Sequence, residues 1–224
     1  RGQNVHGLTF ETLTATTAVR PQGSADYERY IGTWTVTTTS SEVTGQPQTY
    51  TIRIEPYRND KSYKVYDWGV TTLGSKEEDF PFILSYNEAD GSVGINSYED
   101  LGMYGFTYYI YLRYRFLNEQ SQPSIWVSED TLVSGAYDAA SNEITITCGT
   151  FNDNSGITQK ITGLDYVLYT GGKYYEAQNL IRPGYLIGEG DNAKVDYGVG
   201  PYKLTKAPAA AAVPAKRPAK KFES

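Results

Sequence analysis

The sequence predicts an all-β protein, an antiparallel up-and-down β-barrel of about eight to ten strands, with a β-sandwich as the alternative. The composition leans to strand and turn, because 21 Tyr, 22 Gly and 10 Pro occur among 224 residues. Aromatic residues suit pleated sheets, while Gly and Pro interrupt them. Apolar and polar side chains alternate in one short segment after another. Tight turns connect these segments without amphipathic helices between them, which favours hairpins over βαβ units.

We expect three parts along the chain. Residues 1–29 form an N-terminal strand at 7–17 and a linker, either the remnant of a preceding domain or a strand that covers one end of the barrel. Residues 30–205 form the β-barrel domain. Residues 206–224 are an Ala/Pro/Lys-rich tail with too little apolar surface to pack, and we expect it to be disordered. Because the chain starts at Arg1 and not at Met, we expect a processed or truncated product.

The expected strands follow from an alternation in which every second side chain lies on the same face. In the first strand, Trp34 and Val36 share a face. Asp90-Gly91 predicts a hairpin turn, because Gly adopts positive φ readily, and 26-DYERY-30 is the one short helical candidate. The later strands are expected at residues 50–55, 63–66, 82–86, 92–97, 105–118, 131–138, 143–151, 164–170, 173–178 and 199–206.

The longest segment, 105–118, has two contrasting faces. One face is apolar and we expect it in the core: Phe106, Tyr108, Ile110, Leu112, Tyr114 and Phe116. The other is polar and aromatic, and we expect it to meet solvent or a ligand: Thr107, Tyr109, Tyr111, Arg113 and Arg115. If the first face pointed into the barrel, its bulky side chains would fill much of the interior and leave little space for a large cavity.

Histidine and cysteine are too rare for most catalytic and metal sites. His6 lies outside the expected barrel, and Cys148 lies on an alternating strand, where we expect a small core residue. A Ser-His-Asp or Cys-His nucleophile system needs a base held by the fold, for which His6 is a poor candidate. One residue of each kind excludes a zinc site made of His and Cys. The polar loops 152–156 and 189–196 lack the spacing of an EF-hand. We therefore expect no metal and no cofactor.

Acidic side chains occur in three loop clusters, at residues 77–79, 99–100 and 129–130. A glycoside hydrolase needs two carboxyl groups that flank one sugar bond, and neighbouring residues on a strand point to opposite faces. Nothing in the sequence brings two of these clusters together, so we expect solvated turn residues and no enzyme. The alternative, a carboxylate-dependent glycan-active enzyme, requires two carboxyl groups that converge in one cleft.

The net charge of −6 is unevenly distributed. The last nineteen residues carry five Lys or Arg and one Glu, a net +4, so the rest of the chain carries −10. Nucleic-acid affinity depends on neutralising phosphates with Lys and Arg, so we expect no nucleic-acid partner. No apolar run approaches the ~20 residues that span a bilayer, so we expect no transmembrane segment.

Aromatic residues are the positive signal for binding. Trp68 lies in 66-YDWG-69, Trp126 lies in 123-PSIWVS-128, and Tyr109 and Tyr111 lie on the polar face of 105–118. Trp and Tyr combine an apolar ring with a polar edge, which suits stacking on sugar rings. We expect these four residues to bind the ligand. The alternative is that a Tyr-rich sheet simply packs with Tyr.

The segment 30-YIGTWTV-36 resembles the Gly-x-Trp signature of lipocalin-like, or calycin-type, barrels through Gly32 and Trp34. Residues 33–69 are similar to lipocalin-like domains of secreted Bacteroidetes proteins. The resemblance implies that Trp34 packs across the closed end of the barrel beneath a basic side chain from a late strand, for which Lys203 is the candidate. It also implies a secreted, periplasmic or outer cell-surface location in a bacterium, as part of a larger multidomain surface lipoprotein.

These observations predict a non-catalytic binding module of a secreted or cell-surface bacterial protein, with a glycan or a small amphipathic molecule as its ligand. One alternative is a structural or adhesion domain whose partner is another protein, and the other is the glycan-active enzyme. A pocket lined by polar aromatic residues would favour the binding module. An exposed aromatic patch without a concave pocket would favour a protein partner.

Overall fold

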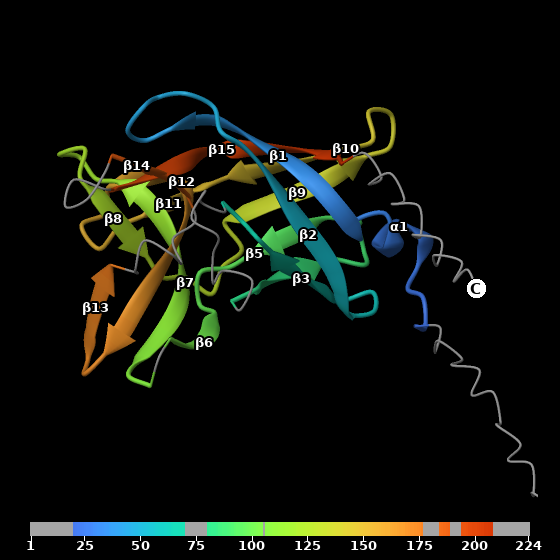
Figure 1. Ribbon diagram of the computed structural model, residues 1–224, viewed down its shortest axis with the longest axis horizontal. Helices are drawn as coiled ribbons and strands as arrows, with labels where there is room; N and C mark the ends of the chain where they lie inside the picture. The colour runs from blue at the N-terminus through green and yellow to red at the C-terminus, as the bar shows by residue number, and fades with distance from the viewer. Residues whose placement is uncertain (1–19, 70–79, 105, 177–183, 189–193, 208–224) are drawn as a thin grey trace, which may run out of the picture.

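The computed structural model describes residues 20–69, 80–104, 106–176, 184–188 and 194–207 (Figure 1). Strands dominate these ranges, which confirms the predicted all-β class, and no helix in them is long and apolar enough to cross a membrane. The predicted strand at 7–17 and the tail beyond residue 207 lie outside them. The elements are α1 (Ala25–Glu28), β1 (Gly32–Ser41), β2 (Thr49–Arg58), β3 (Ser62–Tyr66), β4 (Phe82–Tyr86), β5 (Val93–Ile95), β6 (Asp100–Tyr104), β7 (Tyr108–Leu117), β8 (Pro123–Trp126), β9 (Val133–Asp138), β10 (Glu143–Cys148), β11 (Thr150–Asn152), β12 (Thr158–Thr170), β13 (Lys173–Glu176), β14 (Gly184–Ile187) and β15 (Lys194–Lys206).

Eight antiparallel strands close into a barrel, in the order β1, β2, β3, β4, β5, β9, β10 and β15. The barrel closes because β15 also pairs with β1, with Trp34 opposite Lys206 near one end of the register and Ser41 opposite Gly198 at the other. Each barrel strand lies beside the barrel strand that precedes it in the chain. The predicted antiparallel up-and-down barrel is therefore confirmed, and its closure gives every barrel strand two neighbours.

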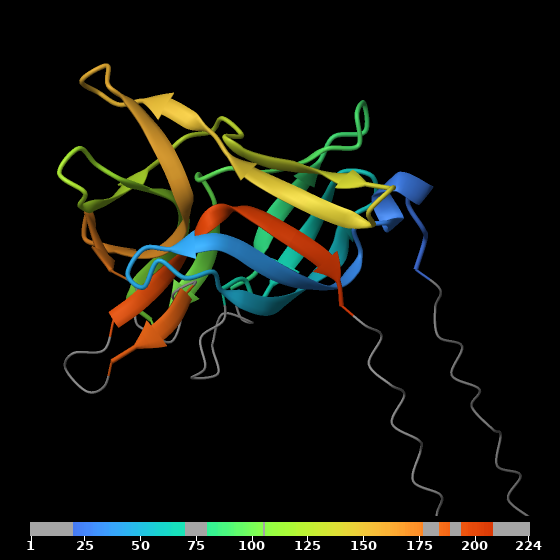
Figure 2. The ribbon, with the colours of Figure 1, turned by 90° about the horizontal axis from the view of Figure 1, so that it is seen from above.

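A second antiparallel sheet stands at one end of the barrel (Figure 2). Its strands run in the order β11, β12, β7 and β6, while β13 pairs with β12 and β8 pairs with β7. Two segments of the chain form this sheet. The segment between β5 and β9 supplies β6, β7 and β8, and the segment between β10 and β15 supplies β11, β12 and β13. The predicted segment 105–118 therefore contributes its strand, β7, to the second sheet and not to the barrel wall.

The apolar face of β7 is buried as its alternation predicts, with one exception. Ile110, Leu112 and Tyr114 are fully buried. Phe106 is 99% exposed, which corrects its expected place in the core. The reason is local, because residues 106–107 form a turn and the strand begins only at Tyr108.

The opposite face of β7 is buried around Arg115, which joins the second sheet to the barrel. The guanidinium group pairs with Glu42 at 2.9 Å and with Asp165 at 2.7 Å. Its central carbon lies 3.7 Å from the centre of the Tyr197 ring in β15. Arg113 is buried on the same face. The expectation that this face meets solvent or a ligand is thus wrong at its arginine end, where ion pairs hold Arg115 and carbonyl oxygens of Ser97 and Leu112 accept hydrogen bonds from Arg113.

Large apolar side chains fill the interior of the barrel. They occupy the inward positions of strands that alternate as predicted. The interior is therefore a packed core and not a ligand cavity. Cys148 packs against the edge of this core, and burial raises the pKa of its thiol to about 12. The buried side chains of the barrel include Trp34, Val36, Ile52, Ile54, Tyr63, Val65, Phe82, Leu84, Val93, Ile95, Val133, Ile144, Ile146, Tyr202 and Leu204.

The short helix α1 closes the end of the barrel that lies away from the second sheet (Figures 1 and 2). Tyr27 of this helix stacks on Tyr63 with ring centres 4.3 Å apart. Tyr30 follows the helix, and its hydroxyl donates a hydrogen bond to the Gly91 carbonyl at 2.7 Å. Trp34 is fully buried beneath them, and its Nε1 donates to the Tyr30 carbonyl at 2.7 Å. Trp34 thus lies at a closed end of the barrel, where the resemblance to lipocalin-like barrels placed it.

The basic side chain beside Trp34 is Lys206 and not Lys203. The Nζ atom of Lys206 lies 4.2 Å from the centre of the Trp34 ring. Lys203 and Lys206 lie three positions apart on β15, so their side chains face opposite sides of the strand. Lys203 therefore lies on the outer face of β15, where it pairs with Glu143 at 2.8 Å. Gly32 has φ +128°, and an added Cβ would lie 3.1 Å from the Lys206 Nζ, so glycine leaves room for this lysine.

Candidate functional site

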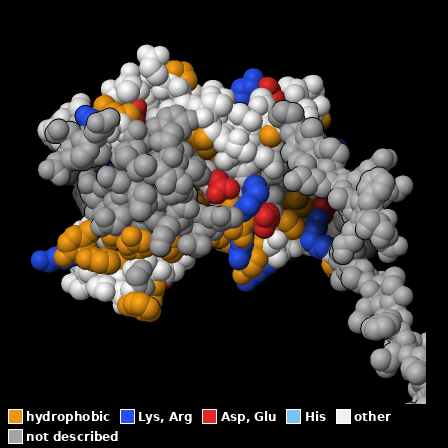
Figure 3. Space-filling view, viewed as in Figure 1, with side chains coloured by type: hydrophobic (Ala, Val, Ile, Leu, Met, Phe, Trp, Pro, Cys, Tyr) orange, Lys and Arg blue, Asp and Glu red, His pale blue; other side chains and the backbone are white. Residues whose placement is uncertain are grey.

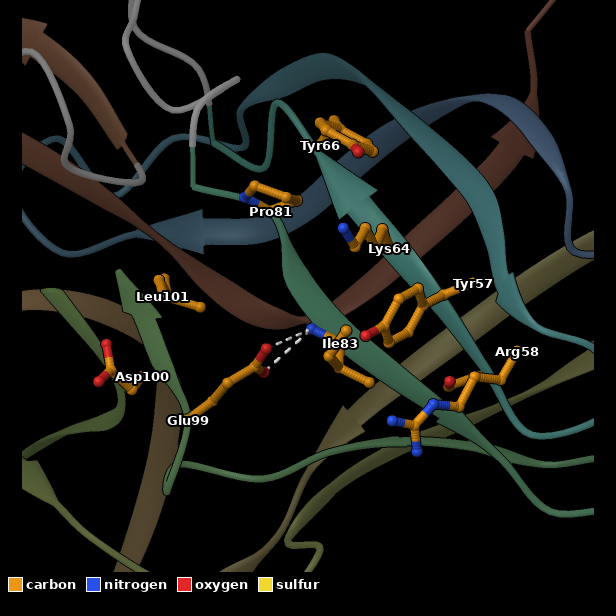
Figure 4. Close-up of a pocket in the computed structure, with 10 residues that line it drawn as sticks. Tyr57, Arg58, Lys64, Tyr66, Pro81, Ile83, Glu99, Asp100 and Leu101 are labelled. Atoms are coloured by element: carbon orange, nitrogen blue, oxygen red, sulfur yellow. Dashed lines mark hydrogen bonds between the residues drawn. The ribbon is translucent and has the colours of Figure 1, made fainter. Parts of the chain in front are cut away.

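A groove of about 700 Å³ runs along the outer wall of the barrel, where β2, β3 and β4 face the start of β6 (Figure 4). Its walls combine aromatic rings, charged groups and aliphatic side chains. Alternation explains the barrel side, because Tyr63 and Val65 point into the core and their neighbours on β3 therefore point outward. The side chains that define the groove are Tyr57, Arg58, Lys64, Tyr66, Ile83, Glu99 and Asp100.

The groove opens where the chain leaves the barrel. β4 pairs with β5 only at Ser85 and Tyr86, and β5 ends at Ile95. The chain then continues to β6 in the second sheet, so no residue of β5 lies opposite Ile83. Two neighbouring strands thus separate at this fork, and a backbone N–H of β4 needs an acceptor from elsewhere.

Glu99 supplies that acceptor. Both of its carboxylate oxygens accept the Ile83 N–H, at 3.0 and 2.9 Å (Figure 4). The Glu99 carbonyl accepts the Leu112 N–H of β7 at 3.0 Å, so one residue bridges the barrel and the second sheet. Burial raises the pKa of the Glu99 carboxyl to about 7, and the hydrogen bond from Ile83 opposes this rise only in part.

Tyr57 presents an aromatic ring to the groove, and this residue is 49% exposed. The Lys64 Nζ lies 4.8 Å from the ring centre and the Arg58 Cζ lies 5.4 Å from it. A cation over an aromatic face is attracted to it, which orients both side chains. Figure 4 shows these three side chains on one side of the groove, with Glu99 and Asp100 on the other. Figure 3 shows charged side chains of both signs and apolar side chains gathered over this part of the barrel.

A second hollow of about 300 Å³ continues from the groove past Ile83 and Glu99. It adds Tyr98 and Glu129 to the lining. Glu99 and Glu129 belong to two of the three predicted acidic clusters, so the structure brings together two groups that no pattern in the sequence connects. The third cluster, at residues 77–79, lies outside the described ranges.

Trp68, an expected ligand contact, is a core residue that is 3% exposed. Its ring packs edge-on against Tyr50, Phe82 and Tyr202, with ring centres 6.0, 5.7 and 4.9 Å apart. Asp67, which precedes it, has φ 65°, and the chain bends here after β3. The structure therefore corrects this expectation, because the enclosed ring is not available to a ligand.

The other three expected ligand residues lie on the second sheet, and none of them lines the groove. Tyr109 is 43% exposed, and Tyr111 on the same face packs edge-on against Tyr169 with ring centres 5.7 Å apart. Trp126 lies in β8 and stacks on Phe151 with ring centres 4.3 Å apart. The four predicted residues therefore do not form one site.

Exposed apolar side chains gather at the outer end of the second sheet, and we call them the tip patch. Figure 3 shows hydrophobic side chains over β13 and near the turn between β6 and β7. Large exposed apolar patches are typical of interaction surfaces. The members of the tip patch are Met103, Tyr109 and Tyr174, which share one face of the sheet, and Phe106 in the turn before β7.

Within the described part of the chain, no group of three or more His, Cys, Asp or Glu side chains is arranged to hold a metal ion. Loop 152–156 is one of the two polar loops noted in the sequence. Its Asp153 accepts the backbone N–H groups of Ser155 and Ile157, which is ordinary turn chemistry. Residues 189–193 of the other loop lie outside the described ranges.

Sequence reasoning missed the groove residues. Lys64 and Tyr66 occupy outward positions of the predicted strand 63–66, so the sequence could have indicated part of this outer wall. Tyr57 lies beyond the predicted strand 50–55, at an irregularity in the pairing of β2 with β3. The contribution of Glu99 depends on the fork between the two sheets, which no local pattern shows. Comparison with known protein families, curated proteins and solved structures finds no match for this chain.

Proposed function

We propose that this chain is a non-catalytic glycan-binding module and that the groove beside Tyr57 binds the glycan. The observation that carries the proposal is a half-exposed tyrosine ring in an open groove that also holds Lys64, Glu99 and Asp100. Sugar rings present a C–H face that stacks on aromatic rings and hydroxyl groups that hydrogen-bond to polar side chains. An open groove suits an oligosaccharide, whose ends extend beyond the contacted residues.

Of the two ligand classes that the sequence predicts, the packed interior favours the glycan. A small amphipathic ligand of a lipocalin-type barrel needs an apolar internal cavity, and large side chains occupy the space inside this barrel. We retain the lipocalin-like relationship as part of the proposal. The buried Trp34 beneath Lys206 in a closed eight-stranded barrel supports it. We also propose, from that relationship, that the chain is part of a larger surface protein and is secreted or lies at the cell surface of a bacterium.

The proposed lack of catalysis is supported by the contacts of Glu99. Both of its oxygens are engaged by the Ile83 N–H, which gives the carboxylate a structural task at the fork. The alternative of a glycan-active enzyme has one point in its favour, since Glu99 and Glu129 line one hollow. Incubating any bound glycan with the protein and measuring new reducing ends decides between them. Cleavage that Glu129→Gln abolishes would establish the enzyme.

A glycan array followed by calorimetric titration of the best binder tests the proposal. We expect Tyr57→Ala to weaken binding by roughly fivefold to tenfold, because stacking of a sugar on one aromatic ring contributes on the order of 1 kcal/mol. Tyr109→Ala is the matched control, since this tyrosine has a similar exposure but lies on the second sheet. Binding that survives Tyr57→Ala and fails with Tyr109→Ala would move the site to the second sheet.

The tip patch favours a second candidate function, a structural or adhesion domain whose partner is another protein. Phe106 is its most exposed member, and a large apolar side chain in that position gains from burial against a partner. Replacing Phe106 with Ser and measuring attachment to a candidate partner surface tests this function. Glycan binding in the groove should not change in that variant.

A further inference from the structure

We infer that the glycan bound in the groove is acidic, carrying a carboxylate or sulfate group that lies against Lys64 and Arg58. The inference rests on the proposed function and adds the chemical class of the ligand. Its starting point is a contrast of charge. The chain without its last nineteen residues carries −10, yet this wall of the groove presents two cations beside one exposed aromatic ring.

The two cations have no acidic partner in the described part of the chain. Other cations of the same wall are paired, since Lys61 contacts Glu88 at 2.7 Å and Arg53 contacts Glu55 at 3.6 Å. Lys64 and Arg58 instead lie over the ring of Tyr57. Unpaired cations on an otherwise acidic surface attract an anion from solution, because the Coulomb attraction is not already satisfied.

The acids across the groove do not neutralise these cations. The Glu99 carboxylate is turned to the Ile83 N–H, and Asp100 accepts the Gly102 N–H at 2.9 Å. Figure 4 places Asp100 on the far side of the groove from Arg58. The groove therefore has a positive side, formed by Lys64 and Arg58 beside Tyr57, and an acidic side, formed by Glu99 and Asp100. A sugar ring stacked on Tyr57 would bring an acidic substituent within reach of both cations.

The geometry favours one acidic group and not a polyanion. Nucleic acids and other dense polyanions need many phosphate contacts for affinity, and the acidic body of this chain would repel their remaining charges. A guanidinium group and an ammonium group suit a single planar carboxylate or a sulfate. Uronic acids, sialic acids and sulfated sugars are the glycans that carry such groups.

The test is an array of matched glycan pairs, each an acidic glycan and its methyl-esterified or desulfated counterpart, followed by titration of the best pair. We expect the acidic member to bind more tightly and its affinity to fall as salt is raised. Lys64→Gln and Arg58→Gln should each weaken its binding roughly tenfold to a hundredfold, as expected for losing a charge-assisted hydrogen bond. Lys61→Gln is the matched control, because this lysine is already paired with Glu88.

The possible outcomes separate the acidic preference from the binding function itself. If neutral and acidic members bind equally and Tyr57→Ala weakens binding of both, the glycan-binding function stands and the acidic preference is refuted. If acidic glycans bind equally well to the Lys64→Gln and Arg58→Gln variants, the assigned cations are wrong. If no glycan on the array binds, the proposed function and this inference both fail. Carboxylated and sulfated pairs in separate arms identify which acidic group is preferred.

Discussion

Replacing Glu99 with Gln is expected to stabilise the protein above neutral pH and to leave its stability nearly unchanged in weak acid. Burial raises the pKa of this carboxyl from 4.5 to about 7 in the folded protein. Between these two values the folded state holds a proton that the unfolded state has released. The free energy of unfolding of the wild type therefore falls as pH rises through this window, and the loss is complete above the folded pKa.

The size of the effect follows from the difference between the folded and unfolded pKa values of Glu99. A tenfold change in an acid dissociation constant corresponds to about 1.4 kcal/mol, so the destabilisation at slightly alkaline pH is at most ~3.5 kcal/mol. The Gln side chain keeps an oxygen that can accept the Ile83 N–H and removes the buried charge. The variant should therefore exceed the wild type in stability by up to that amount above neutral pH.

Urea unfolding of both proteins between about pH 5 and about pH 8 measures the difference. Fluorescence reports the transition, because Trp34 and Trp68 are buried in the folded barrel. Other groups titrate equally in both proteins, so the difference isolates Glu99. Glu119→Gln is the control, since this side chain is exposed. A Glu99→Gln variant that is no more stable than the wild type at the alkaline end would refute the reasoning from burial.

Four further substitutions test the packing by urea unfolding. Arg115→Met should cost roughly 3–5 kcal/mol, because it leaves two buried carboxylates without their cation; a loss under about 1 kcal/mol would show that the network contributes little. Lys206→Ala should lower the free energy of unfolding by about 1 kcal/mol, because the contact with Trp34 is lost. Lys203→Ala should change it by less than about 0.5 kcal/mol. A larger loss for Lys203→Ala than for Lys206→Ala would contradict the placement of Lys206 beside Trp34. Phe106→Ser should leave stability within about 0.5 kcal/mol, since the side chain is exposed; a loss typical of a core residue would place it in the interior.

Alternation in the sequence was enough to predict the barrel and most of its core. Trp34, Ile52, Ile54 and Val65 point inward as their period-2 pattern requires. The pattern works because the two faces of a barrel strand meet such different surroundings. It specifies a face and not a partner, so it could not show that β7 belongs to a second sheet.

The features that the sequence did not reveal depend on contacts between distant segments. Arg115 reads as a solvent-facing residue, and only the approach of Glu42 and Asp165 allows its burial. Lys203 and Lys206 are both basic residues of the last strand, and the register with β1 decides which one meets Trp34. The groove arises because β4 and β5 separate, a consequence of topology that no local window contains.

A crystal structure of the chain with its best acidic glycan tests the central claim most directly. We predict a sugar ring on Tyr57, with its acidic group within hydrogen-bonding distance of Lys64 or Arg58. Density for the glycan inside the barrel, on the tip patch, or anywhere else outside the groove would contradict it.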